Sequence, residues 1–130
     1  MTFMLQKEVV ERIVASPGTK TYGRLSVVIQ ALFDTELMFI VPKESFDPQP
    51  KIESAILYLK TKSRPLVQDL KPLEEIVKLA FSQRRKTLKN CLKSVLDQSQ
   101  TDIDLSQRAE MLSLDNFVTL MNDYEKQYRN

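Results

Sequence analysis

The sequence predicts an α/β fold in which an incomplete sheet is followed by a small all-α domain. Strand and helix patterns alternate over residues 1–62, whereas only helical patterns occur over residues 63–130. A polar stretch that ends in a proline, residues 60–65 (KTKSRP), marks the linker between the two parts. We therefore place the boundary after residue 62.

The first elements are a strand and two helices. Residues 3–8 predict a strand and residues 8–15 a short helix, which ends at the turn signal Ser16-Pro17-Gly18. In the next segment apolar residues recur at i, i+3, i+4, i+7 and i+8, the spacing of one buried helical face. That face consists of Leu25, Val28, Ile29, Leu32 and Phe33.

Two further strands and an irregular loop complete the first part. Residues 34–41 are β-rich and apolar at consecutive positions, which predicts a strand covered on both faces, and Pro42 ends it. A second strand is expected from Ile52 to Lys60. The residues between these strands, 42–50, include three prolines and predict an irregular loop.

The second part reads as a set of short helices. Pro72 suits the first turn of a helix whose apolar stripe ends at Phe81, and the next helix is expected to run to about Leu96. A polar loop over residues 97–102 and a short helix over residues 105–112 follow. Ser113 is a suitable N-cap for the final helix.

Composition excludes several classes of function. The chain has 130 residues, no histidine and a single cysteine, Cys91, which excludes an internal disulfide, the usual zinc sites and catalysis by Ser-His or Cys-His pairs. The longest apolar run, residues 37–41, is far shorter than the roughly 20 residues that span a bilayer. We expect a cytoplasmic protein that binds no metal and no membrane.

Positive charge is concentrated in one block of the chain. Residues 60–93 carry 10 basic and 3 acidic side chains, whereas the flanking regions are balanced or acidic. Within this block, residues 81–93 (FSQRRKTLKNCLK), here called the basic segment, hold five cations and no acid. On the predicted helix, one flank holds Lys86, Lys89 and Lys93. Arg85 borders the buried face, and Arg84 lies on the other flank.

Like charges at this spacing destabilise an isolated helix by about 0.2–0.5 kcal/mol per pair, and a bound polyanion would offset that cost. Solvated helix faces usually alternate in sign, so the absence of acids favours binding of nucleic acid phosphate. The alternative is a solvated face that only keeps the protein soluble.

Four motifs in order resemble one family. They are residues 22–30 (YGRLSVVIQ), 46–55 (FDPQPKIESA), 81–90 (FSQRRKTLKN) and 108–114 (RAEMLSL). Together they resemble the carboxy-terminal half of the bacterial small-subunit ribosomal RNA adenine dimethyltransferases of the KsgA type. The opening residues 4–26 are similar to that family as well, so the likeness covers nearly all of the chain.

The resemblance implies the distal part of a Rossmann-like methyltransferase sheet in residues 1–62 and a helical RNA-docking domain in residues 63–130. The family transfers methyl groups from S-adenosylmethionine to two adjacent adenines near the 3′ end of small-subunit rRNA, so its partner is the 30S subunit. Its glycine-rich cofactor loop has no counterpart here, since Gly18 and Gly23 are the only glycines. We therefore expect this chain alone to bind no cofactor and to be inactive.

The resemblance assigns a site residue in the proline-rich loop. Phe46 matches the aromatic residue that stacks on the extruded adenine in the family, where the base must leave its stacked structure before its amine can react. The alternative is that Phe46 only anchors the loop on the sheet. Arg24 and Lys51 are further candidate RNA contacts, although Lys51 could also be a solvated side chain, and Tyr22 could either meet RNA or cap the sheet.

Three hypotheses of function follow. The chain is the distal part of an rRNA adenine dimethyltransferase, or a free-standing RNA- or DNA-binding module, or a protein-interaction domain whose cations dock an acidic partner. In the first case, a parallel sheet without its neighbouring strands would expose an unpaired edge, and we expect non-native self-association through it.

Overall fold

Three strands form the sheet, and the central one is the last in sequence. The computed structural model describes residues 1–128 and contains β1 (Thr2–Gln6), β2 (Phe33–Val41) and β3 (Ser54–Thr61) in the order β1-β3-β2. Both pairs are antiparallel, so the expectation of a parallel sheet is wrong for these strands. A loop rather than a crossover helix joins β2 to β3, and a loop connection returns the chain antiparallel.

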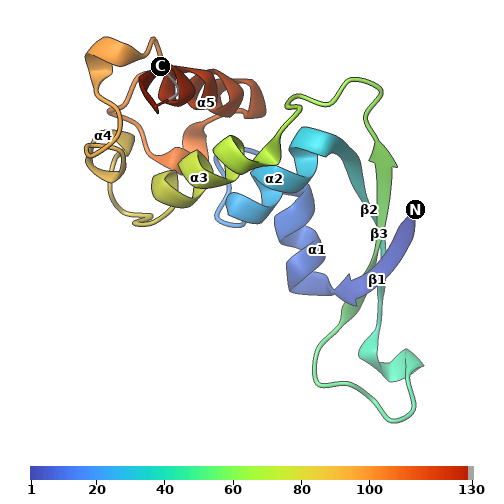
Figure 1. The fold of residues 1–130 in the computed structure, drawn as a ribbon. Helices are drawn as coiled ribbons and strands as arrows, with labels where there is room; N and C mark the ends of the chain where they lie inside the picture. The colour runs from blue at the N-terminus through green and yellow to red at the C-terminus, as the bar shows by residue number, and fades with distance from the viewer. Residues whose placement is uncertain (129–130) are drawn as a thin grey trace.

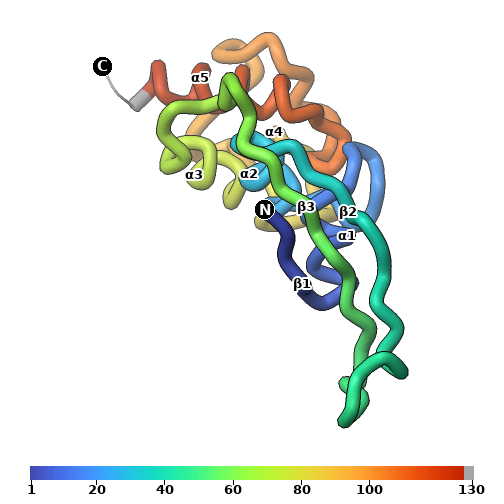
Figure 2. The backbone as a smooth tube through the Cα atoms, turned by 90° about the vertical axis from the view of Figure 1, so that its right-hand side faces the viewer, coloured from blue at the N-terminus to red at the C-terminus, as the bar shows by residue number. Residues whose placement is uncertain are grey.

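Helices cover only one face of this sheet. Figure 1 shows α1 (Lys7–Val14) and α2 (Arg24–Leu32) on the same side of the strands. The prediction that β2 is covered on both faces is therefore wrong, and Phe39 on this strand is 55% exposed. The distal end of the β2–β3 hairpin also extends past the helices, as Figure 2 shows.

The sheet and α1 share a small core. Alternate residues of β3 point toward the helices, and they pack with the apolar face of α1 in one cluster: Val10, Ile13, Ala55, Leu57 and Leu59. The stripe expected on α2 is partly wrong, because Leu25 is 40% exposed while Val27 and Ala31 are buried. The helix is rotated so that these smaller residues meet the helical half of the molecule.

The helical half contains fewer regular helices than the sequence predicts. Its elements are α3 (Leu70–Ala80), α4 (Leu88–Cys91) and α5 (Leu114–Tyr128), with the short 3-10 turns η2 (Gln98–Gln100) and η3 (Ala109–Met111). A further 3-10 turn, η1 (Lys43–Ser45), lies in the loop between β2 and β3. The prediction of a helix over residues 105–112 is wrong, since only η3 forms there.

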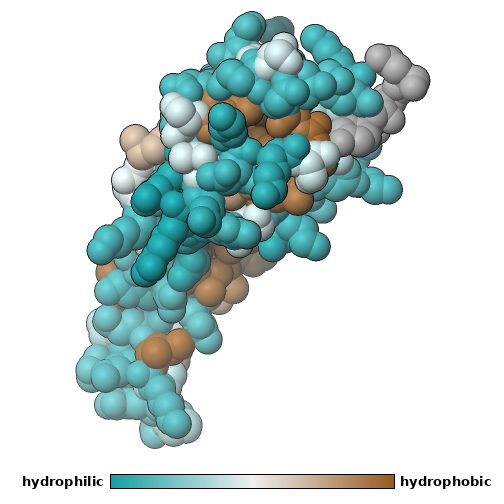
Figure 3. Space-filling model, turned by 90° about the vertical axis from the view of Figure 1, so that its left-hand side faces the viewer, coloured by the Kyte–Doolittle hydropathy of each residue, from teal (hydrophilic) through white to brown (hydrophobic). Residues whose placement is uncertain are grey.

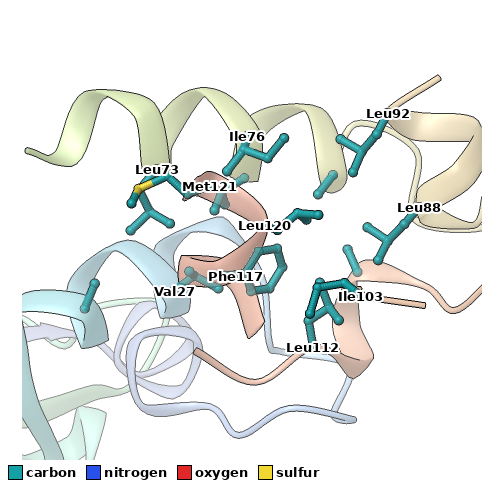
Figure 4. Packing of buried hydrophobic residues seen from close by; sticks show 14 of the residues in the cluster. Val27, Leu73, Ile76, Leu88, Leu92, Ile103, Leu112, Phe117, Leu120 and Met121 are labelled. Carbon is teal, nitrogen blue, oxygen red and sulfur yellow. The ribbon is translucent and has the colours of Figure 1, made fainter. Parts of the chain in front are cut away.

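A larger core lies between α2, α3, α4 and α5. Figure 4 shows apolar side chains from these helices and from the segments between them converging, and the most deeply buried include Leu73, Ile76, Leu88, Leu92, Phe117 and Leu120. Because Val27 and Ala31 of α2 belong to this core as well, α2 contributes to both halves. The boundary after residue 62 remains a prediction.

Two polar side chains of α2, the buried Ser26 and the partly buried Gln30, fix this helix against α1. The hydroxyl of Ser26 donates to the carbonyl oxygen of Arg12 and accepts from the Gly23 amide at 3.1 Å. The Gln30 amide donates to the carbonyl oxygens of Ile13 and Ala15 at 2.7 and 2.9 Å. These bonds use carbonyl groups at the end of α1, where no partner within the helix exists.

Candidate nucleic-acid interface

The basic segment is not the continuous helix that the sequence predicts. α3 ends at Ala80, residues 81–87 form turns, and α4 is a single short helix from Leu88 to Cys91. The prediction that Lys86, Lys89 and Lys93 lie along one flank of a helix is therefore wrong. Lys86 lies in the turn before α4, and Lys93 lies beyond the end of α4.

Long-range backbone hydrogen bonds explain the interruption. In a continuous helix the amides of Leu88 and Lys89 would donate to carbonyl groups four residues earlier. Instead the Leu88 amide donates to the Gln107 carbonyl at 2.9 Å, and the Lys89 amide to the Leu105 carbonyl at 2.8 Å. The segment therefore folds against a distant part of the chain.

Apolar side chains hold the basic segment on the helical core. Leu88 and Leu92 are fully buried. At the start of the segment, the guanidinium of Arg84 donates to the main-chain carbonyl of Tyr22 at 2.6 Å and lies 4.0 Å from the Glu110 carboxylate. Arg84 is thus partly engaged within the protein, although its side chain is still 43% exposed.

The other four cations of the basic segment point into solvent. Arg85, Lys86, Lys89 and Lys93 are all exposed, and within residues 1–128 none of them forms an ion pair. Figure 3 shows that the face of the molecule bearing α4 is largely hydrophilic, with smaller hydrophobic areas. A rigid segment therefore presents unneutralised positive charge, as a phosphate-binding surface requires.

Tyr22 is a structural residue, in contrast to the two roles that the sequence suggests. Its ring is fully buried in the helical core, and its hydroxyl donates to the Leu112 carbonyl at 2.8 Å. Burial raises the pKa of the Tyr22 phenol well above its usual range. The ring meets Phe81 edge-on, and Phe81 stacks on Phe117 at 5.7 Å between ring centroids.

Arg24 lies at the start of α2, outside the basic segment, and lines a pocket together with Arg84. The pocket has a volume of about 610 Å³ and lies between α1, the start of α2 and α3. Arg12 also lines it, which sequence reasoning missed. No local signal marks Arg12, because it belongs to an ordinary i, i+4 ion pair with Glu8 on α1.

Phe46 and Lys51 lie in the loop between β2 and β3, at the far end of the hairpin from α4 (Figure 1). Phe46 is half-buried and directly follows η1. Lys51 lines a second hollow of about 510 Å³ together with Lys7, Lys43 and four glutamates, so that this hollow has no excess of positive charge. The structure therefore does not bring Phe46 together with the basic segment.

Among residues 1–128 no cluster of histidine, cysteine, aspartate or glutamate has the geometry to hold a metal ion. In the same residues, no helix combines the length and apolar character that crossing a membrane requires.

The fold defines the class of protein. The chain matches a dimethyladenosine transferase from Plasmodium falciparum with a TM-score of 0.81 and 21% identity, over 97% of this chain and 58% of that one. It matches the 23S rRNA methyltransferase ErmE with a TM-score of 0.65 and 22% identity, over 95% and 54% of the two chains. This is an α/β chain with part of the Rossmann-like fold of these methyltransferases.

The sequence then defines the family. The chain belongs to the ribosomal RNA adenine dimethylase family, whose model matches residues 1–126. It is 53% identical over 126 residues to ribosomal RNA small subunit methyltransferase A of Francisella tularensis subsp. novicida (strain U112), and 50% identical over 123 residues to the protein of that name from Herminiimonas arsenicoxydans. Each match covers 92% of this chain and 48% of the relative. The chain thus spans about half the length of these curated relatives, and the resemblance seen in the motifs is confirmed.

Proposed function

We propose that this chain is the RNA-docking half of an S-adenosylmethionine-dependent rRNA adenine dimethyltransferase. The whole enzyme would dimethylate two adjacent adenines near the 3′ end of small-subunit rRNA, in the cytoplasm, during assembly of the 30S subunit. Membership of the dimethylase family and the names of the relatives support this proposal. The observation that carries the docking role is the exposed, acid-free charge of a basic segment that the core holds rigid.

Docking would act through the RNA backbone. Arg85, Lys86, Lys89 and Lys93 each present a cation without an ion-pair partner within residues 1–128. Contacts to phosphate fix the register and orientation of RNA, whereas contacts to bases read its sequence. Because Leu88 and Leu92 anchor the segment, little conformational entropy would be lost when RNA binds.

Phe46 would form one wall of the pocket for the target adenine. The lone pair of the adenine amine is delocalised into the ring, and the amine is hidden in stacked RNA, so the base has to be extruded and held. Phe46 is half-buried in an irregular loop, where its ring is held near the surface. Lys51 in the same loop and Arg24 at the start of α2 would add further RNA contacts.

The residues described here do not fit S-adenosylmethionine. A Rossmann-like site for this cofactor needs a glycine-rich turn at the end of a strand, where the backbone can approach the cofactor closely. Gly18 lies in the loop between α1 and α2, where its φ of 87° serves a turn, and its amide donates to the Glu110 carbonyl. Gly23 only begins α2.

Self-association through the sheet is a second property that we propose for the isolated chain. β1 and β2 are both edge strands, and exposed apolar residues on them include Phe3, Met4, Met38 and Phe39. Unpaired strands with apolar side chains favour pairing with another copy. Sedimentation velocity over a range of concentrations would detect dimers, and a strictly monomeric chain would contradict this proposal.

A competition experiment tests the docking role. An excess of this chain is added to a full-length methyltransferase of the family acting on unmethylated small subunits. If this chain occupies the part of the RNA to which the enzyme docks, methyl transfer should slow as the concentration of the chain increases. A variant with Lys86, Lys89 and Lys93 changed to glutamine should not compete.

The matched control changes three exposed lysines outside the basic segment, Lys60, Lys71 and Lys78, to glutamine. This control variant should compete as well as the unmodified chain. Equal competition by both triple variants would show that the basic segment is not the docking surface. Absence of any competition by the unmodified chain would rule out RNA docking by this half.

A further inference from the structure

The pocket between α1, α2 and α3 combines positive charge with an apolar wall. We call it the arginine pocket, after Arg12, Arg24 and Arg84, which line it together with a single acid, Glu74. Arg12 is ion-paired with Glu8, and Arg84 lies 4.0 Å from the Glu110 carboxylate, so the positive charge that an external anion can meet in this concave site is chiefly that of Arg24.

The three arginines differ in how far the protein already uses them. Arg12 is paired with Glu8 at 3.0 Å, and Arg84 donates to the Tyr22 carbonyl. Arg24 is exposed, and within the described chain it has no ion pair. Arg24 is therefore the residue with a guanidinium free for an external anion.

The apolar wall lies beside Arg24. Leu25 is 40% exposed, and Val28 and Phe81 are partly buried, so that each offers some surface to the pocket. The Phe81 ring is held in place by its contacts with Tyr22 and Phe117. A volume of about 610 Å³ lies within the range of sites that hold small organic ligands.

We infer that the arginine pocket receives one unpaired nucleotide of RNA, with its base against Leu25, Val28 and Phe81 and its phosphate against Arg24. Continuity with the basic segment favours RNA over a free anion, because Arg84 both lines the pocket and belongs to that segment. The inference rests on the proposed function for the presence of RNA. It adds that docking captures an unstacked nucleotide in a pocket that Phe46 does not line.

Binding to two RNAs of equal length and charge tests the inference, one a hairpin with a single-stranded loop and the other fully paired. Arg24→Gln should weaken binding of the looped RNA about five- to tenfold and leave the paired RNA within twofold of the unmodified chain. Leu25→Ser should weaken binding of the looped RNA by a similar factor without changing the dependence on salt, because it removes apolar contact and no charge. Arg64→Gln, an exposed arginine outside both surfaces, is the matched control and should change neither affinity.

The outcomes separate this inference from the proposed function. Equal weakening of both RNAs by Arg24→Gln, or no effect of Leu25→Ser, would overturn the pocket and leave the docking role standing. The pocket variants could lose binding of the looped RNA while the variant with glutamine at Lys86, Lys89 and Lys93 binds normally. That result would support the pocket and refute docking by the basic segment. If the unmodified chain binds neither RNA, both proposals fail.

Discussion

The guanidinium of Arg84 donates a hydrogen bond of 2.6 Å to the main-chain carbonyl of Tyr22, 62 residues earlier in the sequence. This bond ties the start of the basic segment to the loop that precedes α2. The side chain of Tyr22 extends the connection, because its hydroxyl donates to Leu112 just before α5. Three distant stretches of chain thus meet at one residue.

Removal of the Arg84 side chain should reduce stability as well as charge. Arg84→Ala removes a charged donor from the Tyr22 carbonyl, and because the side chain is 43% exposed we expect a loss of about 1 kcal/mol in the free energy of unfolding. Urea denaturation measures this loss. Arg85→Ala, at an exposed neighbour without an ion pair within residues 1–128, should change stability by no more than about 0.5 kcal/mol. Equal effects of the two substitutions would contradict a structural role for Arg84.

The exposed lysines of the basic segment should determine how RNA binding depends on salt. Changing Lys86, Lys89 and Lys93 to glutamine should lower the slope of log affinity against log salt by roughly 2–3, at about 0.7–0.9 per phosphate contact. Affinity should fall similarly for matched and scrambled RNA. Filter binding from low to physiological salt measures the slope, and circular dichroism checks that the fold is retained. An unchanged slope in a folded variant would mean that the segment is only a solvated surface.

The buried phenol of Tyr22 should make stability depend on pH in alkaline solution. Its pKa is raised in the folded protein above the ordinary value of about 10, so the contribution to stability is complete below pH 10 and declines as the pH rises further. Above pH 10 the free energy of unfolding of the unmodified chain should fall more steeply with pH than that of Tyr22→Phe. The difference in slope should reach up to about 1.4 kcal/mol per pH unit. At neutral pH, Tyr22→Phe should cost about 1 kcal/mol through the lost bond to Leu112. If the free energy of unfolding depended on pH in the same way in the unmodified chain and in Tyr22→Phe, the phenol would not have this role.

Phe46 should matter more for methyl transfer than for RNA binding. In a complete enzyme that contains this half, Phe46→Ala should slow single-turnover methylation, because stacking on an extruded base is worth about 1–3 kcal/mol. RNA affinity should change little, since the basic segment lies at the other end of the molecule. Phe46→Tyr keeps an aromatic face and should largely restore the rate. Wild-type rates in Phe46→Ala would leave Phe46 only a packing role.

The isolated chain should neither bind S-adenosylmethionine nor methylate RNA. Its two glycines serve a turn and a helix start, and neither builds a cofactor cradle. Isothermal titration with the cofactor and a labelled-methyl assay on unmethylated small subunits measure the two activities. Saturable binding at micromolar cofactor would show that the residues present do form a site.

Several features of the fold could be predicted from sequence because they depend on local spacing. The helix at Arg24–Leu32 and the strands on either side of the proline-rich loop form within a few residues of their expected bounds. Four motifs in order also predicted the family, and the family match over residues 1–126 confirms it. The concentration of cations in one segment is a property of composition and needs no structure.

Only the tertiary structure decided how those cations are presented. The basic segment has a helical pattern, but its amides at Leu88 and Lys89 bond to residues 105–107, and no local pattern encodes a partner so far along the chain. For the same reason the burial of Tyr22 and the meeting of Arg12 with Arg24 and Arg84 could not be predicted from sequence. Local periodicity determined the strands and the longer helices, whereas long-range packing and hydrogen bonds determined where helices end, which helical patterns fail to form a helix and which charged side chains remain free.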